Sequence, residues 1–290
     1  MSLELNLTRS GTMENRSEQI ASLLKNTYDM ALKRRAARLL SGLEVFEGAR
    51  ILDLGCGDGF YLHLLSELGN YDLYGIDPDD RALKSAKRNL ADKKIDLRQG
   101  KIETLPYEDH FFDRIILSEV LEHLQDDRLG LKDCYRVLKP GGIVIATVPH
   151  AHYPFFWDPL NKFLEVFFNF HIRKGFFSGF WFDHKRLYRP EELRSIFEKE
   201  KWIVLELVKL THYCLPFNHY LLNIGARLLQ GRKLPQNLAR SVSKFEIEGS
   251  ETKGKRLMDY VRDFLIWVDS FNDRLTQPHS AVGLFIKCKK

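Results

Sequence analysis

The sequence predicts an α/β protein with an open, mainly parallel sheet and helices on both faces. Two observations indicate this class. First, a short apolar run, Ala49 to Leu54, ends in a glycine-rich turn. Leucines at helical spacing follow, and then a second apolar run, Leu73 to Ile76, which is the order of a β-α-β unit. Second, the same alternation continues to Val148. Alternating strands and helices imply parallel strands, because each helix returns the chain to the same edge of the sheet.

The individual elements follow from the spacing of apolar residues. Between Ser17 and Leu40 this spacing predicts one or two helices that cover the sheet edge or a ligand cleft. A turn at Lys139 to Gly142 precedes the fifth strand, and Pro190 opens a late helix, where its missing N–H costs nothing. The expected strands are 49–54, 73–76, 95–98, 113–118, 143–148, 202–208 and 282–288, with further helices through 62–68, 80–92 and 126–138.

Composition sets broad limits on the kind of protein. With 290 residues, of which 44% are hydrophobic, the chain can bury a large core. Its four cysteines lack metal-ligand spacing, which favours reduced thiols in a cytoplasmic protein. No segment has about 18 uncharged apolar residues in a row, so we expect neither secretion nor a membrane span. A formal charge of +5 is modest and selects no partner.

The turn after the first strand, DLGCGDG at 53–59, has three alternating glycines. They let the backbone bend tightly toward a ligand while the next helix points its N-terminus at it. Dinucleotide enzymes use a similar device, but Asp53 and Asp58 would repel a pyrophosphate and attract the ammonium and sulfonium of S-adenosylmethionine. The two aspartates therefore favour S-adenosylmethionine over NAD; the alternative is that they only cap the following helix.

A third acid, Asp77, ends the second expected strand, twenty residues after Gly57. A carboxylate at this place can accept hydrogen bonds from both ribose hydroxyls. That role suits either cofactor.

These residues resemble motif I and the acidic loop of class I S-adenosylmethionine-dependent methyltransferases, within the broad group that includes ubiquinone and menaquinone biosynthesis enzymes. Three further stretches fit: GKIETLPY at 100–107, SEVLEH at 118–123 and RVLKPGG at 136–142. The likeness extends over 47–150, is weaker over 184–208 and is absent elsewhere. It implies a Rossmann-like, seven-stranded sheet with an antiparallel last strand, and S-adenosylmethionine as the cofactor.

The resemblance also implies roles for individual residues. Those expected to bind the cofactor are Asp53, Gly55, Cys56 and Gly57 at the methionine part, Asp77 and Pro78 at the ribose, Ile102 and Glu103 at the adenine, and Ser118 and Glu119 near the sulfur. The chain departs from the family at Lys101, where an aspartate usually contacts the adenine amino group. That contact must come from another group.

Three histidines are candidates for a catalytic base. The protein mainly has to align acceptor, methyl and sulfur, and it needs a base only if the acceptor must lose a proton. His123 and His150 follow core strands, where ligands bind in open α/β sheets, and His184 precedes the late helix. The alternative is that they only order their loops. We expect no metal, although Glu119, Glu122 and His123 contain suitable donor atoms.

The segment from Phe155 to Phe182 contains ten of the chain's twenty phenylalanines, at the position where this family inserts elements that cover the substrate. Five residues at helical spacing form one apolar face: Leu160, Phe163, Leu164, Phe167 and Phe168. This face predicts either a lid or membrane-surface helix that admits a lipidic or aromatic acceptor, or packing on the C-terminal helices or a second subunit. We expect a second helical insertion, about 215–275, to form another wall; its basic residues fit a solvated helix face or an anionic surface.

The expected division of the chain has six parts. They are an N-terminal helical cap (1–46), the cofactor-binding core (47–150), an aromatic-rich lid insertion (151–189), a core helix and strand (190–210), a helical insertion (211–280) and the final core strand (281–290).

The sequence predicts an enzyme that methylates the oxygen or carbon of a small, hydrophobic or lipid-linked acceptor, in the cytoplasm and in possible contact with a membrane surface. An RNA methyltransferase is an alternative, but no RNA-binding module is visible and no nucleic-acid partner is expected. A non-catalytic cofactor-binding scaffold and an NAD oxidoreductase are the others. The sequence leaves the acceptor and the oligomeric state open.

Overall fold

The computed structural model describes residues 15–215, 253–275 and 278–290. Its centre is one seven-stranded sheet in the order β3-β2-β1-β4-β5-β7-β6. Strands β1 to β5 are parallel, and β7 runs antiparallel to both β5 and β6. The strands are β1 (Arg50–Leu54), β2 (Asp72–Asp77), β3 (Ile95–Gln99), β4 (Phe112–Ser118), β5 (Leu138–Pro149), β6 (Ile203–Leu210) and β7 (Gly283–Lys289). This topology confirms the predicted fold class, including the antiparallel last strand.

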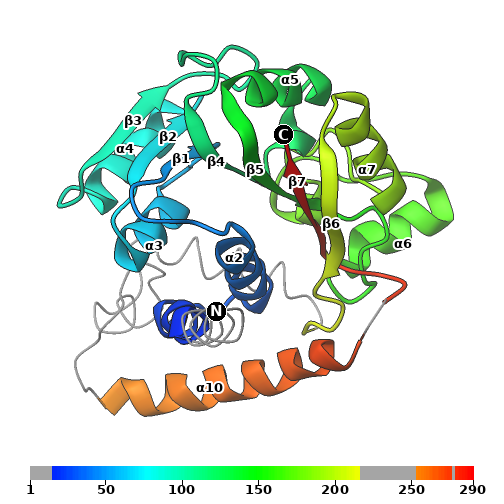
Figure 1. Ribbon diagram of the computed structural model, residues 1–290. Helices are drawn as coiled ribbons and strands as arrows, with labels where there is room; N and C mark the ends of the chain where they lie inside the picture. The colour runs from blue at the N-terminus through cyan, green and yellow to red at the C-terminus, as the bar shows by residue number, and fades with distance from the viewer. Residues whose placement is uncertain (1–14, 216–252, 276–277) are drawn as a thin grey trace, which may run out of the picture.

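Helices lie on both faces of this sheet (Figure 1). On one side are α2 (Met30–Gly42), α3 (Phe60–Leu68) and α4 (Asp80–Asn89), and beyond α2 lies α10 (Lys253–Ser270). On the other side are α5 (Asp127–Val137) and α7 (Pro190–Lys199). The remaining elements are α6 (Pro159–Phe168) and the short helices η1 (Leu121–His123), η2 (Phe176–Trp181) and η3 (Phe271–Arg274).

The core divides into two layers because successive side chains of a strand point to opposite faces. On β1, Ile51 packs with residues of α2, α3 and α4, whereas Leu52 and Leu54 pack with residues of α5 and α7. Burying large aliphatic side chains such as these stabilises the fold by roughly 1.5–3 kcal/mol each. The sheet therefore holds the ends of its strands in fixed positions.

The expected turn at Lys139 to Gly142 is wrong in one respect: these residues belong to β5. The backbone N–H of Gly141 donates to Lys290, and the N–H of Lys290 donates to Gly142, so the C-terminal strand holds this segment in the sheet. Pairing with β4 shifts register between Phe112 and Arg114, which accommodates the extra residues as a bulge.

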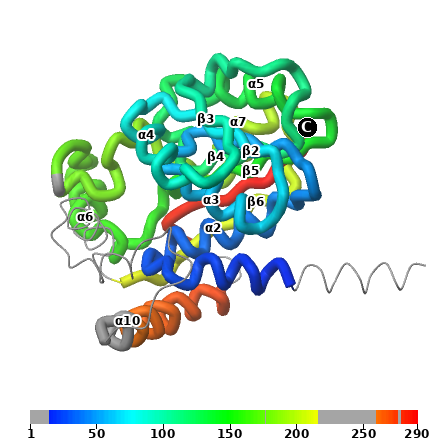
Figure 2. Tube along the Cα trace, turned by 90° about the vertical axis from the view of Figure 1, so that its left-hand side faces the viewer, coloured from blue at the N-terminus to red at the C-terminus, as the bar shows by residue number. Residues whose placement is uncertain are grey.

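The parallel strands end on the side of the molecule where α6 lies, as Figure 2 shows. The antiparallel pairing of Pro149 with Gly283 marks this edge, because β5 ends there and β7 begins there. Within the described ranges, none of the helices has the length and apolar character needed to cross a bilayer. The expected insertion at 211–280 is described only in part, since 216–252 and 276–277 lie outside the described residues.

Candidate functional site

The glycine turn between β1 and α3 folds back onto the end of β2. Gly55, Gly57 and Gly59 all have positive φ, at 68°, 55° and 86°. The N–H groups of Gly55 and Cys56 both donate to the carbonyl of Ile76, at 2.7 and 3.0 Å. A Cβ on Gly55 would lie 2.6 Å from Val120, whereas a Cβ on Gly57 would meet no atom within 4 Å. Gly57 therefore leaves open space in front of the turn, where the sequence places a ligand.

Asp77 ties this turn to the next loop. One of its carboxylate oxygens accepts from the N–H of Gly57 and the other from the N–H of Asp79, both at 2.8 Å. Each oxygen keeps a second acceptor position, because a carboxylate offers about four lone pairs in all. The carboxylate expected at the ribose is thus held by backbone groups and retains capacity for a ligand's hydroxyls.

Asp53 is a buried carboxyl beside the turn, with only 1% of its surface exposed. Within the part of the chain that the structure describes, its Oδ2 has no hydrogen-bond partner. Burial, followed by the negative charges of Asp77 and Asp58, raises the pKa of Asp53 well above its usual value. A carboxylate is costly in such a place unless a cation compensates it. The site therefore favours a positively charged ligand group.

Ser118 and Glu119 lie at the end of β4, within a polar cluster. Ser118 Oγ donates to Tyr61 Oη at 3.0 Å, and Thr147 Oγ1 donates to Glu119 Oε1 at 3.2 Å. Arg35 of α2 forms an ion pair with Glu119, 2.9 Å between Nη1 and Oε2. Glu119 has φ +57°, an uncommon conformation for a residue other than glycine that often accompanies a functional constraint.

Sequence reasoning did not select Arg35. Its only local signal is the helical spacing that predicted α2 over a cleft, and a basic pair, Arg34 and Arg35, is ordinary on a helix surface. The structure separates the two: Arg34 pairs with Asp269 of α10, whereas Arg35 pairs with Glu119. A guanidinium among the predicted cofactor-binding residues is suited to hold a carboxylate.

The residues expected near the adenine lie on the loop after β3. Ile102 is buried among the apolar residues of the α5 and α7 layer, and Glu103 is half-buried. The N–H of Gly100 donates to the carbonyl of Asp77, and Gln99 Nε2 donates to the carbonyl of Pro78, so this loop lies against the acidic end of β2. Lys101 is exposed.

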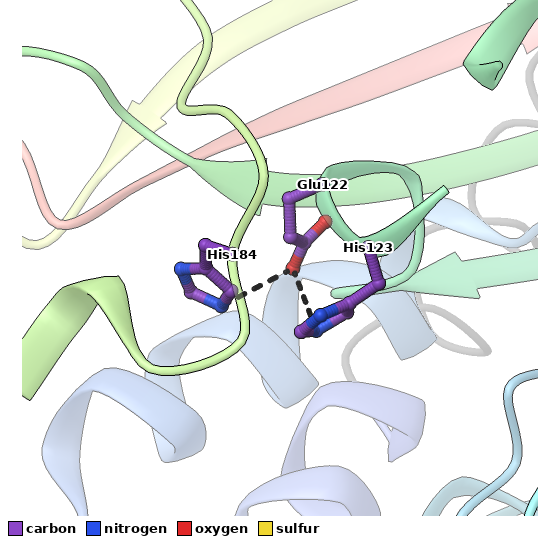
Figure 3. A group of neighbouring side chains, drawn as sticks. All are labelled: Glu122, His123 and His184. Carbon is purple, nitrogen blue, oxygen red and sulfur yellow. Dashed lines mark ion pairs between the residues drawn. The ribbon is translucent and has the colours of Figure 1, made fainter. Parts of the chain in front are cut away.

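Three side chains converge beyond the end of β4: Glu122 and His123 of η1, and His184 of the segment before α7 (Figure 3). Glu122 Oε1 lies 3.9 Å from His123 Nε2 and 4.0 Å from His184 Nε2. Their ligand atoms all lie within 4.8 Å of one another, which is a spacing that can surround a metal ion. Sequence reasoning compared the two histidines separately, and it is the tertiary structure that brings His184 to Glu122.

The chemistry of the cluster depends on the protonation of its members. His123 Nδ1 donates to the carbonyl of Asp183 at 3.0 Å, which leaves the lone pair on Nε2 when the ring is neutral. Glu122 is fully buried, and neither carboxylate oxygen has a hydrogen-bond partner among the residues described. Burial, with a smaller contribution from Glu119, raises the pKa of Glu122 well above its usual value.

His150 has different neighbours. Its Nδ1 donates to the carbonyl of His152 at 3.1 Å, and its ring is 1% exposed. Burial lowers the pKa of His150 to about 4, so the ring is neutral at pH 7. A base this weak is poorly matched to proton transfer near neutral pH.

The chain shares a recognisable domain with known proteins. Residues 52–146 match the family described as "Methyltransferase domain". The segment of 111 residues that resembles the ubiquinone biosynthesis O-methyltransferase of Maricaulis maris is 38% identical to it and covers 37% of this chain and 43% of that protein. The human mitochondrial ubiquinone biosynthesis O-methyltransferase is 32% identical over 181 residues, which is 60% of this chain and 46% of that one.

Among solved structures, phosphoethanolamine N-methyltransferase 2 of Haemonchus contortus shares the fold, with a TM-score of 0.55 and 18% identity over 88% of this chain and 52% of that one. The chain thus spans less than half the length of the two ubiquinone enzymes that it matches. The matched family segment runs from β1 into β5, and it includes the glycine turn, Asp77 and the end of β4.

Proposed function

Residues 52–146 are a class I S-adenosylmethionine-dependent methyltransferase domain, and from this premise we propose that the protein transfers the methyl group of S-adenosylmethionine to the oxygen or carbon of a small, hydrophobic or lipid-linked acceptor. The observation that carries the proposal is the pair of acids at the glycine turn. Asp53 is buried, with an oxygen that has no hydrogen-bond partner among the described residues, and Asp77, the residue expected at the ribose, accepts a hydrogen bond from the backbone N–H of Gly57. This arrangement favours a cationic nucleoside cofactor over a dinucleotide.

We propose that different residues of the chain bind different parts of the cofactor. Asp53 with the turn Gly55-Cys56-Gly57 receives the methionine ammonium, and Arg35 receives the methionine carboxylate. Asp77 and Pro78 hold the ribose, Ile102 and Glu103 flank the adenine, and Ser118 and Glu119 lie near the sulfur. The bound cofactor supplies a sulfonium leaving group, so these residues need only orient it and exclude water for in-line displacement.

The cluster in Figure 3 is the best candidate for receiving an acceptor's proton. His123 presents Nε2 to the cluster, 3.9 Å from Glu122 Oε1, and a positive charge on the imidazole would favour the ionised form of Glu122 beside it. His184 Nε2 lies 4.0 Å from the same carboxyl oxygen. His150 is the weakest of the three histidine candidates because of its low pKa.

Replacing His123 by Gln should lower kcat at least tenfold with little change in KM, because the lost proton transfer belongs to the chemical step. The same assay with EDTA, and then with added Mg²⁺ or Zn²⁺, separates proton transfer from metal catalysis. Unchanged activity in EDTA supports the base. Activity that vanishes in EDTA and returns with one cation would assign the cluster to a metal instead.

The acceptor class follows from the aromatic segment. Phe163, Phe167 and Phe168 of α6 are 46, 67 and 66% exposed within the described structure, at the edge where the parallel strands end. Large apolar side chains in such a row are unusual on a surface that meets only water. We therefore assign 151–189 as a lid that faces a hydrophobic acceptor or a membrane surface. The chain 1–46 would act as a cap and 211–280 as the second wall, in a cytoplasmic enzyme that meets membranes from that side.

Calorimetric titration with S-adenosylmethionine, S-adenosylhomocysteine and NADH tests the cofactor assignment. We expect the first two to bind in the micromolar range and NADH not to bind. Binding of NADH alone would overturn the assignment of Asp53 and the glycine turn to S-adenosylmethionine, and with it the proposed methyl transfer. With the cofactor established, methyl transfer to quinol-like and phenolic lipids tests the acceptor class.

A further inference from the structure

A large cavity lies on the side of α2 away from the cofactor residues. Its volume is about 1060 Å³, and its walls are α2, β6 and the segment formed by α10 and η3. Arg34 and Arg38 of α2 line it, whereas Arg35 of the same helix pairs with Glu119 at the candidate active site. Helix α2 therefore faces the cavity and the candidate active site with different residues. A volume of this size is typical of small-molecule sites.

Two of the cavity's arginines are already compensated. Arg34 pairs with Asp269 and Asp273, at 2.8 and 2.7 Å, and this ties α2 to α10 and η3. Arg38 pairs with Glu206 of β6. These three ion pairs build the walls and leave neither guanidinium free for a ligand.

Two lysines of the cavity form no ion pair with a carboxylate within the described ranges. Lys209 Nζ donates to the carbonyl of Pro278 at 2.9 Å, and no hydrogen bond or ion pair is formed by the ammonium of Lys33 among the described residues. Both side chains are half-buried. Burial, and then the charge of Arg262, lowers the pKa of Lys33 against a smaller opposite effect of Asp269, so the ammonium is costly where it lies. A negatively charged group in the cavity would relieve that cost.

The rest of the lining is mixed. Glu191, Thr211 and His212 are among its polar residues, and its apolar residues include Ile20, Ala37, Leu207, Leu210, Ile266 and Leu284. A ligand with a charged headgroup at the lysines could therefore place an apolar body against the side chains of the sheet and α10. Burial of apolar surface contributes roughly 25 cal/mol per Å², so the body would account for much of the affinity.

We propose that this cavity binds an amphiphilic anion, with a carboxylate or phosphate held by Lys33 and Lys209 and an aliphatic body against the apolar wall. Its lining includes none of the residues proposed to bind S-adenosylmethionine. It does not depend on the proposed methyl transfer.

The test is calorimetric titration of the full chain with dodecyl phosphate below its critical micelle concentration. We expect one molecule to bind per chain, with affinity weakened about tenfold or more in the double variant Lys33→Gln, Lys209→Gln, because two charge-assisted contacts are lost. The matched control is Lys87→Gln, Lys199→Gln, which removes the same charge from two exposed helix positions and should bind like wild type. Inorganic phosphate alone should bind far more weakly, since it lacks the apolar body.

Three further arms separate this site from others. The Asp77→Asn variant, expected to lose nucleoside affinity, should still bind dodecyl phosphate, and saturating S-adenosylhomocysteine should not displace it. Displacement would place the probe in the cofactor site and overturn the proposal. So would equal affinity in the double lysine variant, no binding by wild type, or binding only to anionic phosphatidylglycerol vesicles, which would assign the lysines to a membrane surface instead.

Discussion

At the scale of single residues, the site is organised around groups whose burial opposes their charge. Asp53 and Glu122 are buried carboxyls with raised pKa values, and His150 is a buried imidazole with a lowered one. Each of these groups destabilises the folded protein at a pH where its charged form would be present. Such groups are common at functional sites, where a ligand or a reaction compensates the buried charge. This distinguishes the three from the many exposed acids and histidines of the chain.

Replacing Asp53 by Asn should stabilise the unliganded protein and weaken cofactor binding. A raised folded pKa means that stability is greatest below the unfolded value of 3.8 and falls as pH rises through the folded pKa. Asn has no charge, so the variant should be more stable than wild type at pH 8 by roughly 1–3 kcal/mol and should have a higher melting temperature. Near pH 4 the two melting temperatures should approach each other. Calorimetry should show loss of S-adenosylmethionine affinity.

The matched control for this change is Asp92→Asn, at a carboxylate that is 75% exposed. It should leave the pH dependence of the melting temperature unchanged. A lower melting temperature for Asp53→Asn at pH 8 would contradict the assignment of Asp53 as an uncompensated buried acid.

His150 should make the protein sensitive to acid. Because its pKa is lowered from 6.5 to about 4, the unfolded state takes up the proton first, and stability is lost as pH falls between these values. The loss can reach about 3 kcal/mol. His150→Gln lacks this term, so urea unfolding at pH 7.5 and 4.5 should show a smaller drop than in wild type. The exposed His279→Gln serves as control, and an identical drop in all three proteins would refute the prediction.

At the scale of elements, the glycine turn and the ends of strands decide what the site can hold. The turn requires left-handed backbone at both Gly55 and Gly57. Val120 leaves no room for a side chain at Gly55, whereas a Cβ at Gly57 would meet no atom within 4 Å. The first glycine is therefore needed for packing. The second is needed for backbone conformation and for whatever approaches the turn.

Gly57→Ala and Gly48→Ala form a matched pair that isolates the ligand's need for space. Both positions have positive φ, 55° and 73°, and a Cβ at either meets no atom within 4 Å. Each substitution should cost on the order of 1 kcal/mol of stability. Only Gly57→Ala should lose S-adenosylmethionine binding in calorimetry. Equal affinity in the two variants would show that the cofactor does not approach the turn at Gly57.

At the scale of the whole molecule, the exposed aromatic face of α6 and the ends of the parallel strands lie on one side. An enzyme placed with this side against a lipid surface would take a lipid-linked acceptor without carrying it through water. The Asp158 carboxylate begins α6 by accepting from Asn161 and also accepts from Phe180, so the helix is tied to η2 and its orientation is fixed.

The triple variant Phe163→Gln, Phe167→Gln, Phe168→Gln should lose cosedimentation with anionic liposomes, because it removes the apolar side chains that would insert into the lipid surface. It should keep wild-type S-adenosylmethionine affinity, because none of the three is a proposed cofactor-binding residue. A comparison variant, Ile203→Gln, Leu205→Gln, removes apolar side chains that are 58 and 50% exposed on β6. It should sediment like wild type. If the folded wild-type protein does not sediment with liposomes, the α6 face serves another contact.

The sequence by itself determined the strand and helix alternation, the glycine turn and Asp77, because these signals are local: apolar period, left-handed glycines and short motifs at fixed spacing. The antiparallel direction of the last strand was implied only by the resemblance to the family. It could not place Arg35 beside Glu119 or His184 beside Glu122, and it could not reveal a cavity behind α2. Those arrangements depend on how helices and loops far apart in the chain pack across the sheet. Even within the turn at Lys139 to Gly142, where the motif read as a loop, pairing with the C-terminal residue placed the segment in β5. Local chemistry chose the elements, whereas the distances between side chains, on which charge interactions and cavities depend, were set only by tertiary packing.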